Sequence, residues 1–398
     1  QHADVTTPAT PPLRDATVTL PEGVSLSPGT ADGLKGCTDA QIDLHSTAAN
    51  TCPDASKVGQ VHIATPLLGS GPGDYLPDGP GGPRYQLNGG IYLRAPDPGA
   101  TRADGLYGIF LDIEDAQTGI VVKLKGDVVP DERTGQLRAM FRDNPPLPFT
   151  DFLLEFKGGP RAALANPPAC GAAQTTATFT AWGGPEATPS STFTVDADGH
   201  GGLCPAVRPF APTFTAGTLD PLAGGFSPFT MTIRRHDGDQ ELRNVQVDLP
   251  PGLLGVVKGV PRCGADDAAA GTCDPASRVG TTMVSAGAGD HPYSLPGKVY
   301  LSGRYKGEPL SLSIVVRAIA GPFDLGTVVV RAPIHVDAAH AKLTVPADDL
   351  PTILQGVPLR LKTINVTLDR PGFTFNATSC DPAGIAARLI GTGGAVAT

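Results

Sequence analysis

The sequence lacks long hydrophobic runs. No stretch approaches the roughly 18 consecutive apolar residues that a membrane-spanning helix needs, so we expect no membrane span. The start, Gln1-His2-Ala3-Asp4, has neither a basic segment nor an apolar one, so we expect no signal peptide there. The chain of 398 residues is therefore interpreted as a mature or trimmed form of something longer.

Positive charge and aromatic residues are also scarce. The chain has 30 Lys and Arg against 39 Asp and Glu, a net charge of −9, and its sequence shows no basic patch. Nucleic acid and anionic lipid are poor partners for such a surface. Aromatic residues make up 6% of the chain and Trp182 is its single Trp, which argues against a surface that stacks on sugars.

Familiar catalytic motifs are missing. The sequence has no His-Glu-x-x-His, no Gly-x-Ser-x-Gly and no Gly-Lys-Ser/Thr phosphate loop. The eight His residues are scattered, and we interpret His335 and His340 as turn or surface residues rather than metal ligands. Glu114 and Asp115 could in principle act as a glycosidase pair, but they more simply end a strand. We therefore predict no enzyme, no catalytic residues and no cofactor.

No Cys-x-x-Cys pair occurs, which excludes zinc-ribbon and thioredoxin-like sites. Spacings of 15, 34 and 10 residues instead favour local disulfides, namely Cys37–Cys52, Cys170–Cys204 and Cys263–Cys273. The alternative is reduced, buried cysteines in a cytosolic protein. Disulfides imply an oxidising compartment, so we expect an extracellular or cell-surface location. Cys380 is left over and is expected to be unpaired or bonded to another subunit.

Helix breakers are abundant, with 50 Gly and 41 Pro, while 40% of the residues are hydrophobic. Long helices are disfavoured, yet enough apolar surface exists for real cores. Short helices are expected at 266–270 and 349–354. Elsewhere, apolar and polar residues alternate between turn signals, as in antiparallel sandwiches. We predict an all-β fold of tandem duplicated, immunoglobulin-like antiparallel β-sandwich units braced by disulfides.

An internal duplication supports the tandem interpretation. Residues 13–23 align with 242–252, residues 51–59 with 272–280, and residues 91–93 with 299–301. Cys37 aligns with Cys263 and Cys170 with Cys380. The order of these landmarks never breaks. We therefore predict two β-sandwich repeat units, 1–205 and 206–398.

Each predicted unit lacks strands that the other has. Residues 210–233 precede the aligned region of the second unit, whereas the first has 1–12 in that place. Residues 191–204 follow Cys170 as a return arm with no counterpart after Cys380. Either the chain is part of a longer array, or neighbouring molecules supply strands to vacant sheet edges. In the second case, 1–12 and 385–390 are the expected donor segments.

Acidic turns offer weak calcium candidates. Asp196 and Asp198, and likewise Asp237 and Asp239, place carboxylates at i, i+2 spacing. Neither turn has the full twelve-residue calcium loop, so plain hairpin turns are the simpler interpretation. Asn365 and Asn376 begin formal N-glycosylation motifs, but strand asparagines explain them equally well.

Three segments carry a resemblance: Leu249-Pro250-Pro251-Gly252-Leu253-Leu254-Gly255, residues 320–332 and residues 365–380. Over most of the second unit, and loosely over the first, the chain resembles large uncharacterised secreted or cell-surface β-repeat proteins of high-GC actinobacteria. The resemblance implies a compartment and a lineage, and a further cysteine after the equivalent of Cys380. It implies no activity.

These features favour a non-enzymatic extracellular structural protein, a subunit of a cell-surface filament, sheath or layer. Its expected partner is itself, joined end to end as a homopolymer through strand edges, with glycan or cell-wall contact as a further option. The alternative is a surface adhesin or glycan-binding module. A third option is a secreted hydrolase whose site is unreadable from the sequence.

Overall fold

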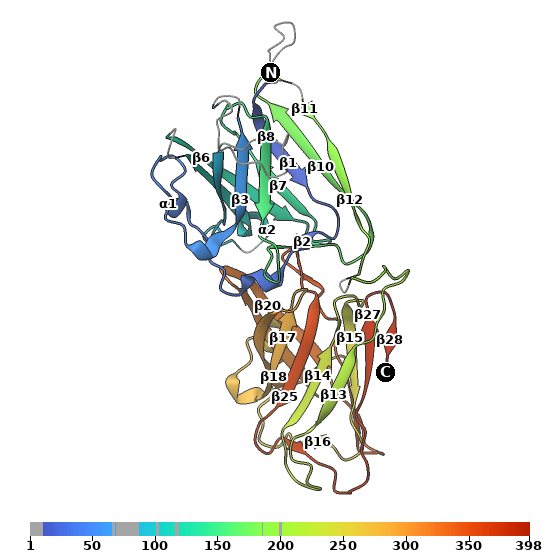
Figure 1. The fold of residues 1–398 in the computed structure, drawn as a ribbon. Helices are drawn as coiled ribbons and strands as arrows, with labels where there is room; N and C mark the ends of the chain where they lie inside the picture. The colour runs from blue at the N-terminus through green and yellow to red at the C-terminus, as the bar shows by residue number, and fades with distance from the viewer. Residues whose placement is uncertain are drawn as a thin grey trace. The chain divides into compact units, whose positions relative to one another are not determined.

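The chain is nearly all β, in several antiparallel sheets (Figure 1). The computed structural model describes residues 11–65, 68, 87–100, 103–115, 119–184, 186–198 and 201–398. Two compact units divide the chain. Unit 1 comprises Gln1–Val195 with Gly321–Phe323 and Gln355–Val357, and unit 2 comprises Asp196–Ala320, Asp324–Leu354 and Pro358–Thr398.

Unit 1 is built on one ten-stranded sheet. Its order is β11 (Glu186–Ala187), β10 (Gly171–Ala181), β1 (Leu13–Thr19), β7 (Leu137–Phe141), β6 (Ile120–Pro130), β5 (Gly108–Asp115), β4 (Leu87–Leu93), β3 (Lys57–Ala64) and β8 (Asp151–Phe156), with β12 (Ser190–Val195) also paired to β10. A small second sheet pairs β2 (Ser25–Leu26) with β9 (Leu164–Ala165).

The core of unit 1 follows from strand alternation. Ile109, Leu111 and Ile113 of β5 point to one face and join Ala16 of β1 and Phe141 of β7 in a single buried cluster. The sheet therefore curls so that its β1 and β7 region packs against β3 to β5. A tight turn joins β6 to β7 and keeps the sheet continuous, because the Asp131 carboxylate accepts hydrogen bonds from the turn amides.

Unit 2 has two larger sheets. The first has seven strands in the order β13 (Thr213–Thr218), β14 (Phe229–Arg234), β25 (Leu361–Leu368), β17 (Arg278–Ala286), β18 (Tyr293–Ser302), β19 (Ser311–Ala320) and β20 (Phe323–Pro333). The second has five strands in the order β21 (His335–Asp337), β22 (Lys342–Pro346), β15 (Leu242–Asp248), β27 (Ala386–Gly391) and β28 (Val396–Ala397). A short pair in the same unit joins β16 (Leu254–Gly255) to β26 (Thr374–Phe375). Elsewhere in the chain, β23 (Ile353–Leu354) pairs with β24 (Val357–Pro358).

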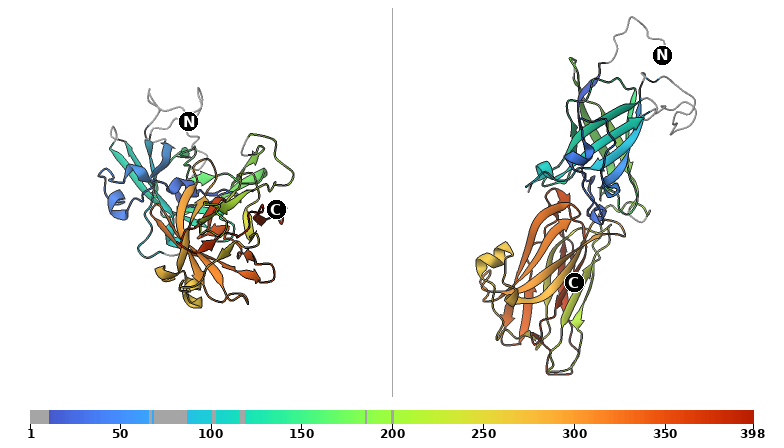
Figure 2. Two further views of the ribbon diagram at one scale, coloured as in Figure 1. Left: turned by 90° about the horizontal axis from the view of Figure 1, so that it is seen from below. Right: turned by 90° about the vertical axis from the view of Figure 1, so that its left-hand side faces the viewer.

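The two larger sheets of unit 2 pack face to face, as two views of the ribbon show (Figure 2). Ile233 of β14 lies in the same buried cluster as Val245 and Val247 of β15 and Leu389 of β27. The alternating apolar residues of both sheets thus face one shared interior.

Helices are few and short in the described residues. They are α1 (Asp39–Ile42), α2 (Ala103–Leu106), α3 (Ala265–Ala270) and the 3₁₀ turns η1 (Pro28–Ala31), η2 (Asp54–Ser56) and η4 (Pro275–Ser277). The expected helix at 266–270 forms within α3, but the one at 349–354 does not. There, Pro351 interrupts the segment and the Leu350 amide donates to the Arg243 carbonyl instead. Within the described part of the chain, no helix is long and apolar enough to cross a membrane.

The two units repeat the same strand pairings. β1 pairs with β7 and β10, as β15 pairs with β22 and β27. β3 pairs with β4 and β8, as β17 pairs with β18 and β25. The backbone N–H groups of the aligned residues Leu20 and Leu249 donate equivalent hydrogen bonds of 2.9 Å, to the carbonyls of Leu137 and Leu343 respectively.

The units also repeat a turn. The turns at residues 21–24 and 250–253 each contain a glycine with positive φ, Gly23 at 87° and Gly252 at 82°. Residues with a side chain rarely adopt a positive φ, which accounts for glycine at the same place in both units.

The units differ at two strand edges. In unit 2, β14 pairs with β25 and β13 pairs with β14. In the described part of unit 1, no strand pairs with residues 152–156 of β8 on the side away from β3. Conversely, β12 pairs with the first half of β10, whereas among residues 201–398 no strand takes that place beside β27. Residues 381–385 accordingly form no strand.

Candidate functional sites

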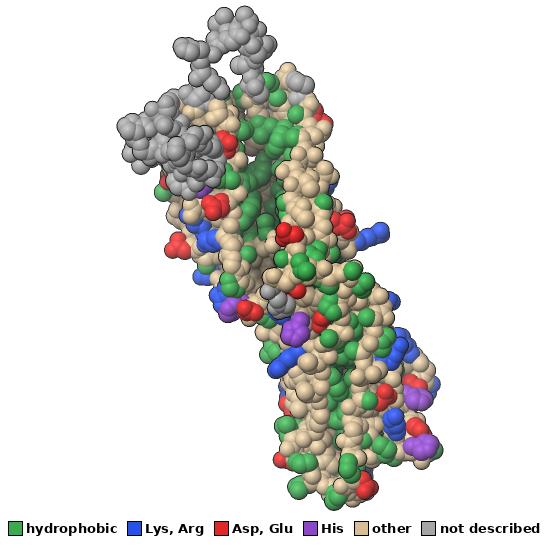
Figure 3. All heavy atoms as spheres, turned by 45° about the vertical axis from the view of Figure 1, so that its right-hand side comes forward, with side chains coloured by type: hydrophobic (Ala, Val, Ile, Leu, Met, Phe, Trp, Pro, Cys, Tyr) green, Lys and Arg blue, Asp and Glu red, His purple; other side chains and the backbone are tan. Residues whose placement is uncertain are grey.

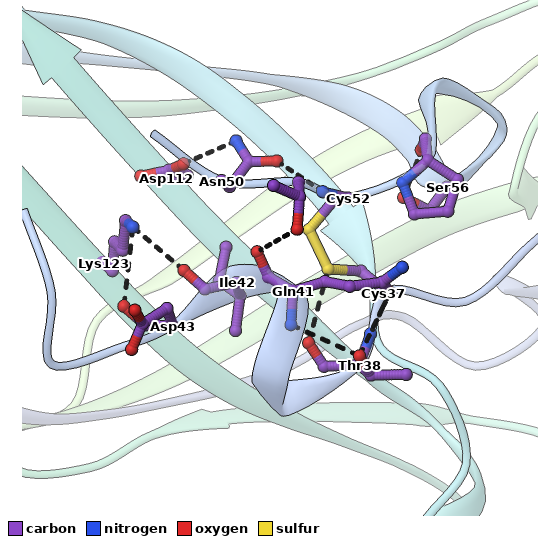
Figure 4. The surroundings of a disulfide bond; sticks show 12 residues. Cys37, Thr38, Gln41, Ile42, Asp43, Asn50, Cys52, Ser56, Asp112 and Lys123 are labelled. Atoms are coloured by element: carbon purple, nitrogen blue, oxygen red, sulfur yellow. Dashed lines mark hydrogen bonds between the residues drawn. A yellow bond between two sulfur atoms is a disulfide. The ribbon is translucent and has the colours of Figure 1, made fainter. Parts of the chain in front are cut away.

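The most elaborate arrangement of polar side chains in unit 1 surrounds the Cys37–Cys52 disulfide (Figure 4). The loop between the two cysteines begins with α1, whose first turn is closed by a reciprocal cap. The backbone N–H of Gln41 donates to the Thr38 hydroxyl, and the backbone N–H of Thr38 donates to the side-chain oxygen of Gln41 over 2.9 Å. This cap fixes a helix of four residues that has little stability of its own.

The loop lies on the outward face of the sheet. Cys37, Ile42 and Phe110 are fully buried and form a small cluster separate from the main core. Phe110 belongs to β5 and points to the opposite face from Ile109 and Leu111. The disulfide loop thus turns part of an outer sheet face into a second, smaller core.

Two charged side chains fasten this loop. The Asn50 amide donates to the Asp112 carboxylate over 2.6 Å, and the Lys123 ammonium donates to the carbonyls of Ile42 and Ala48 over 2.9 and 2.6 Å. Asp112 is 3% exposed, and burial raises the pKa of its carboxyl, with the nearby Glu114 carboxylate raising it further. Among the described residues, Oδ1 of Asp112 has no hydrogen-bond partner.

Unit 2 repeats the disulfide loop without the buried acid. Cys263 is bonded to Cys273, and both cluster with Ala268 of α3 and Tyr300. Val315 packs on this cluster from β19. Apolar packing therefore does in unit 2 what Asp112 and Lys123 do in unit 1, and both loops are best understood as structural braces.

The remaining cysteines fall in two groups. Cys170 and Cys204 are both disulfide-bonded, and since the other four bonded cysteines are paired, these two form the third bridge. Cys380 is a free, exposed thiol. The structure thus forms the three bridges that the spacing predicts, and three disulfides fit an oxidising compartment.

The acidic turns are engaged by protein groups. The Asp237 carboxylate accepts from the Lys362 ammonium over 2.8 Å and from the Gly289 amide over 3.0 Å. Asp239 is 4% exposed, Asp198 accepts from the Gly202 amide over 2.7 Å, and Asp196 is exposed. Among the described residues, no group of three or more His, Cys, Asp and Glu is placed to hold a metal ion.

A buried ion pair lies beside the second acidic turn. The Arg235 side chain is 2% exposed and donates to the Glu241 carboxylate over 3.0 Å. Arg208 lies 4.0 Å from the same carboxylate and is held by the carbonyl of Asp239. Burial raises the pKa of Glu241, although the three arginines around it, Arg235, Arg208 and Arg360, act in the opposite direction. Sequence reasoning missed this cluster: Arg235 and Glu241 are only six residues apart, but nothing local shows that they are buried or that Arg208 and Arg360 join them from distant segments.

The two histidines considered as metal ligands, His335 and His340, each contact a different carboxylate. His335 contacts Glu308 over 3.0 Å and His340 contacts Asp337 over 2.7 Å, and both histidines are exposed. The structure does not bring them into one ligand set.

The two candidate glycosylation asparagines and Trp182 make hydrogen bonds of their own. The Asn365 amide donates to the Thr232 hydroxyl over 2.9 Å, and Asn376 is 7% exposed with its amide on the carbonyls of Asp220 and Leu222. The Trp182 indole N–H donates to the Asn144 carbonyl over 2.9 Å. Glu114 is exposed and interacts with Asp112, two residues before it on β5.

An apolar cavity of about 130 Å³ lies between the two larger sheets of unit 2. Its lining is almost entirely hydrophobic, and Thr374 carries the one polar side chain in it. Ligand sites usually combine such a surface with several convergent polar groups. The cavity is therefore interpreted as imperfect packing between sheets.

None of the family models, curated proteins and solved structures compared with the chain shows significant similarity to it.

Proposed function

We propose that the protein is a non-enzymatic extracellular structural protein, a subunit of a cell-surface filament, sheath or layer. Copies would join through β-strand edges, and β8 would be the accepting edge. The observation that carries this proposal is the side of β8 with which no described strand pairs, called the open side below. Its residues 152–156 correspond to 364–368 of β25, which pair with β14 in unit 2.

An open strand edge presents a row of backbone N–H and C=O groups that another strand can pair with. The side chains next to this edge are apolar, since Phe152, Leu154 and Phe156 pack against the core of unit 1 from one side of it. In the space-filling view, apolar side chains are visible in a furrow of unit 1 (Figure 3). A strand with alternating apolar residues, such as the Phe-Thr-Met-Thr-Ile-Arg of β14, fits both features.

We further propose that the two units are tandem copies of one immunoglobulin-like sandwich. The shared pairings, the shared disulfide loops and the equivalent hydrogen bonds of Leu20 and Leu249 support this. On this account β8 has, among the described strands, no counterpart of the β14 that pairs with β25. The donor segment predicted from the sequence, 1–12, lies outside the described residues except for Pro11 and Pro12.

The experiment is a pair of proline substitutions in β8, Leu153→Pro and Leu154→Pro. Backbone N–H groups alternate along a strand, so one of the two removes a donor on the open side and leaves the ladder to β3 intact. Val336→Pro, on the exposed edge strand β21, is the matched control. Negative-stain images and sedimentation velocity report the assembly, and circular dichroism reports the fold.

We expect wild type and V336P to form regular polymers, and the better-folded β8 variant to stay monomeric. Deleting residues 1–12 should have the same effect if that segment is the donor, and polymers without it would assign the donor role elsewhere. Polymers formed normally by both β8 variants, or wild type that never assembles, would contradict the proposal.

A further inference from the structure

The described surface of unit 2 carries a basic pocket that the proposed assembly does not use. It has a volume of about 290 Å³ and lies where η4, β17, β18 and the end of β25 meet. Its charged lining is three cations and one carboxylate, Arg278, Lys298, Arg370 and Asp369, and Tyr300 forms part of the wall. The local charge is therefore +2 in a chain whose net charge is −9.

The three cations of the pocket outnumber its one carboxylate, Asp369. Among the described residues, no carboxylate lies within 4.0 Å of the charged groups of Arg278, Lys298 or Arg370. Arg278 and Lys298 are exposed at the rim of the pocket. Two exposed cations that converge repel one another, and an anion bound between them removes that repulsion.

Arg370 is held in place before any ligand arrives. One of its terminal nitrogens donates to the carbonyls of Ala276 and Arg278 over 2.6 and 3.0 Å. Within the described part of the chain, its other guanidinium nitrogens make no hydrogen bond. A guanidinium fixed in this way loses little side-chain entropy when it binds an oxyanion, which its planar fork of N–H donors matches well.

Part of this arrangement recurs in unit 1. The Lys157 ammonium donates to the carbonyl of Lys57, the residue that aligns with Arg278. Lys298, in contrast, pairs with Thr281 on β17 at the place where Gly90 pairs with Gln60 in unit 1. Both units thus have a pair of cations here, Lys57 and Lys157 in unit 1 and Arg278 and Arg370 in unit 2. Unit 2 adds Lys298 as a third.

We propose that this pocket binds a single anionic group, a phosphate or a carboxylate, carried by an extracellular ligand. Its volume of about 290 Å³ lies just below the roughly 300–1,000 Å³ found for ligand pockets, which suits one charged group with little else attached. Phosphate and carboxylate share the geometry that arginine recognises, and the choice between them is left to the experiment.

The test is saturation-transfer NMR of the intact chain with three small probes, namely methyl phosphate, galacturonate and uncharged galactose. Arg278→Gln combined with Lys298→Gln is the main variant, because both side chains are exposed and the fold should tolerate their loss. Lys342→Gln combined with Arg388→Gln is the control, since it removes two exposed cations of the same unit outside the pocket. R370Q is a second variant that removes the preset guanidinium.

We expect at least one anionic probe to bind wild type and the control variant, and to bind R278Q/K298Q at least about tenfold more weakly. R370Q should weaken binding as well, and added NaCl should weaken it in wild type. The tighter of the two anionic probes identifies the group that the ligand carries.

Three results would overturn the proposal. They are an absence of binding by both anions, equal losses in the pocket and control variants, and galactose binding as strong as galacturonate binding. None of them bears on polymer formation, so the pocket and the β8 edge can fail separately.

Discussion

The side chain of Asn50 donates a 2.6 Å hydrogen bond to the carboxylate of Asp112, which lies 62 residues further along the chain. Asn50 also accepts from the Cys52 amide over 2.9 Å. One amide side chain therefore links the Cys37–Cys52 bridge to β5. The carboxylate at the end of this link is buried, and its protonation bears on the stability of unit 1.

The buried Asp112 should make the stability of unit 1 depend on pH. Burial raises the pKa of this carboxyl in the folded state above its ordinary value of 3.8, so folding favours the protonated form. Its contribution to stability is fully present below that ordinary value and is lost as the pH rises through the folded-state pKa. Asp112→Asn keeps a side-chain oxygen for Asn50 but cannot ionise. We expect D112N to become steadily more stable than wild type as the pH rises from about 4 to 7.

Chemical denaturation at each pH measures this difference. Asp349→Asn is the control. The hydrogen bond from Arg243 lowers the pKa of that exposed carboxyl, so its contribution to stability changes with pH in the opposite direction to that of Asp112. Its contribution is present above the ordinary pKa and fades as the pH falls. A D112N curve parallel to wild type at every pH would show that Asp112 does not titrate differently on folding.

Removing either short disulfide should destabilise the chain by a similar amount. Loops of 15 and 10 residues are closed by Cys37–Cys52 and Cys263–Cys273, and the chain-entropy model gives about 3 kcal/mol for each. The unit 1 loop retains the Asn50 and Lys123 hydrogen bonds after C37S/C52S, so its outer core should persist at low denaturant. Guanidinium unfolding of the two double serine variants measures both losses. A change near zero for either would mean that the bridge adds nothing to the folded chain.

The buried ion pair should be far more sensitive than an exposed one. Glu241→Ala leaves Arg235 buried without its carboxylate, and breaking such a pair costs about 3–5 kcal/mol. Asp349→Ala breaks the exposed contact with Arg243, where both side chains are more than half exposed, and we expect a much smaller loss of stability. Equal effects of the two substitutions on urea unfolding would disprove this contrast.

The elements of this fold that sequence reasoning predicted are the ones set by local signals. Alternating residues identify a strand at 120–125, the first half of β6 (Ile120–Pro130), and cysteine spacing identifies the bridges. Asp112 shows the limit of such signals. Its place in an alternating strand predicts a solvent-facing side chain, yet the disulfide loop folds over that face and buries it.

Local sequence patterns also fail to show which charged side chains meet in the fold. The sequence has no basic patch, but Arg278 of β17, Lys298 of β18 and Arg370, just after β25, converge in one pocket. The i, i+2 spacing of Asp237 and Asp239 likewise gives no sign of Lys362, which reaches Asp237 from 125 residues away. Pairings between distant strands decide these contacts, and a local pattern carries no information about them.

The open edge of β8 is tested most directly by hydrogen–deuterium exchange followed at single amides. In dilute, monomeric protein, alternate amides of residues 152–156 should exchange fast, whereas those of 364–368 in β25 should be protected by β14 and β17 on either side. Assembly should then protect the β8 amides and leave those of β25 unchanged. Protection of β8 equal to that of β25 in the monomer, or no gain in protection on assembly, would contradict β8 as the edge where copies join.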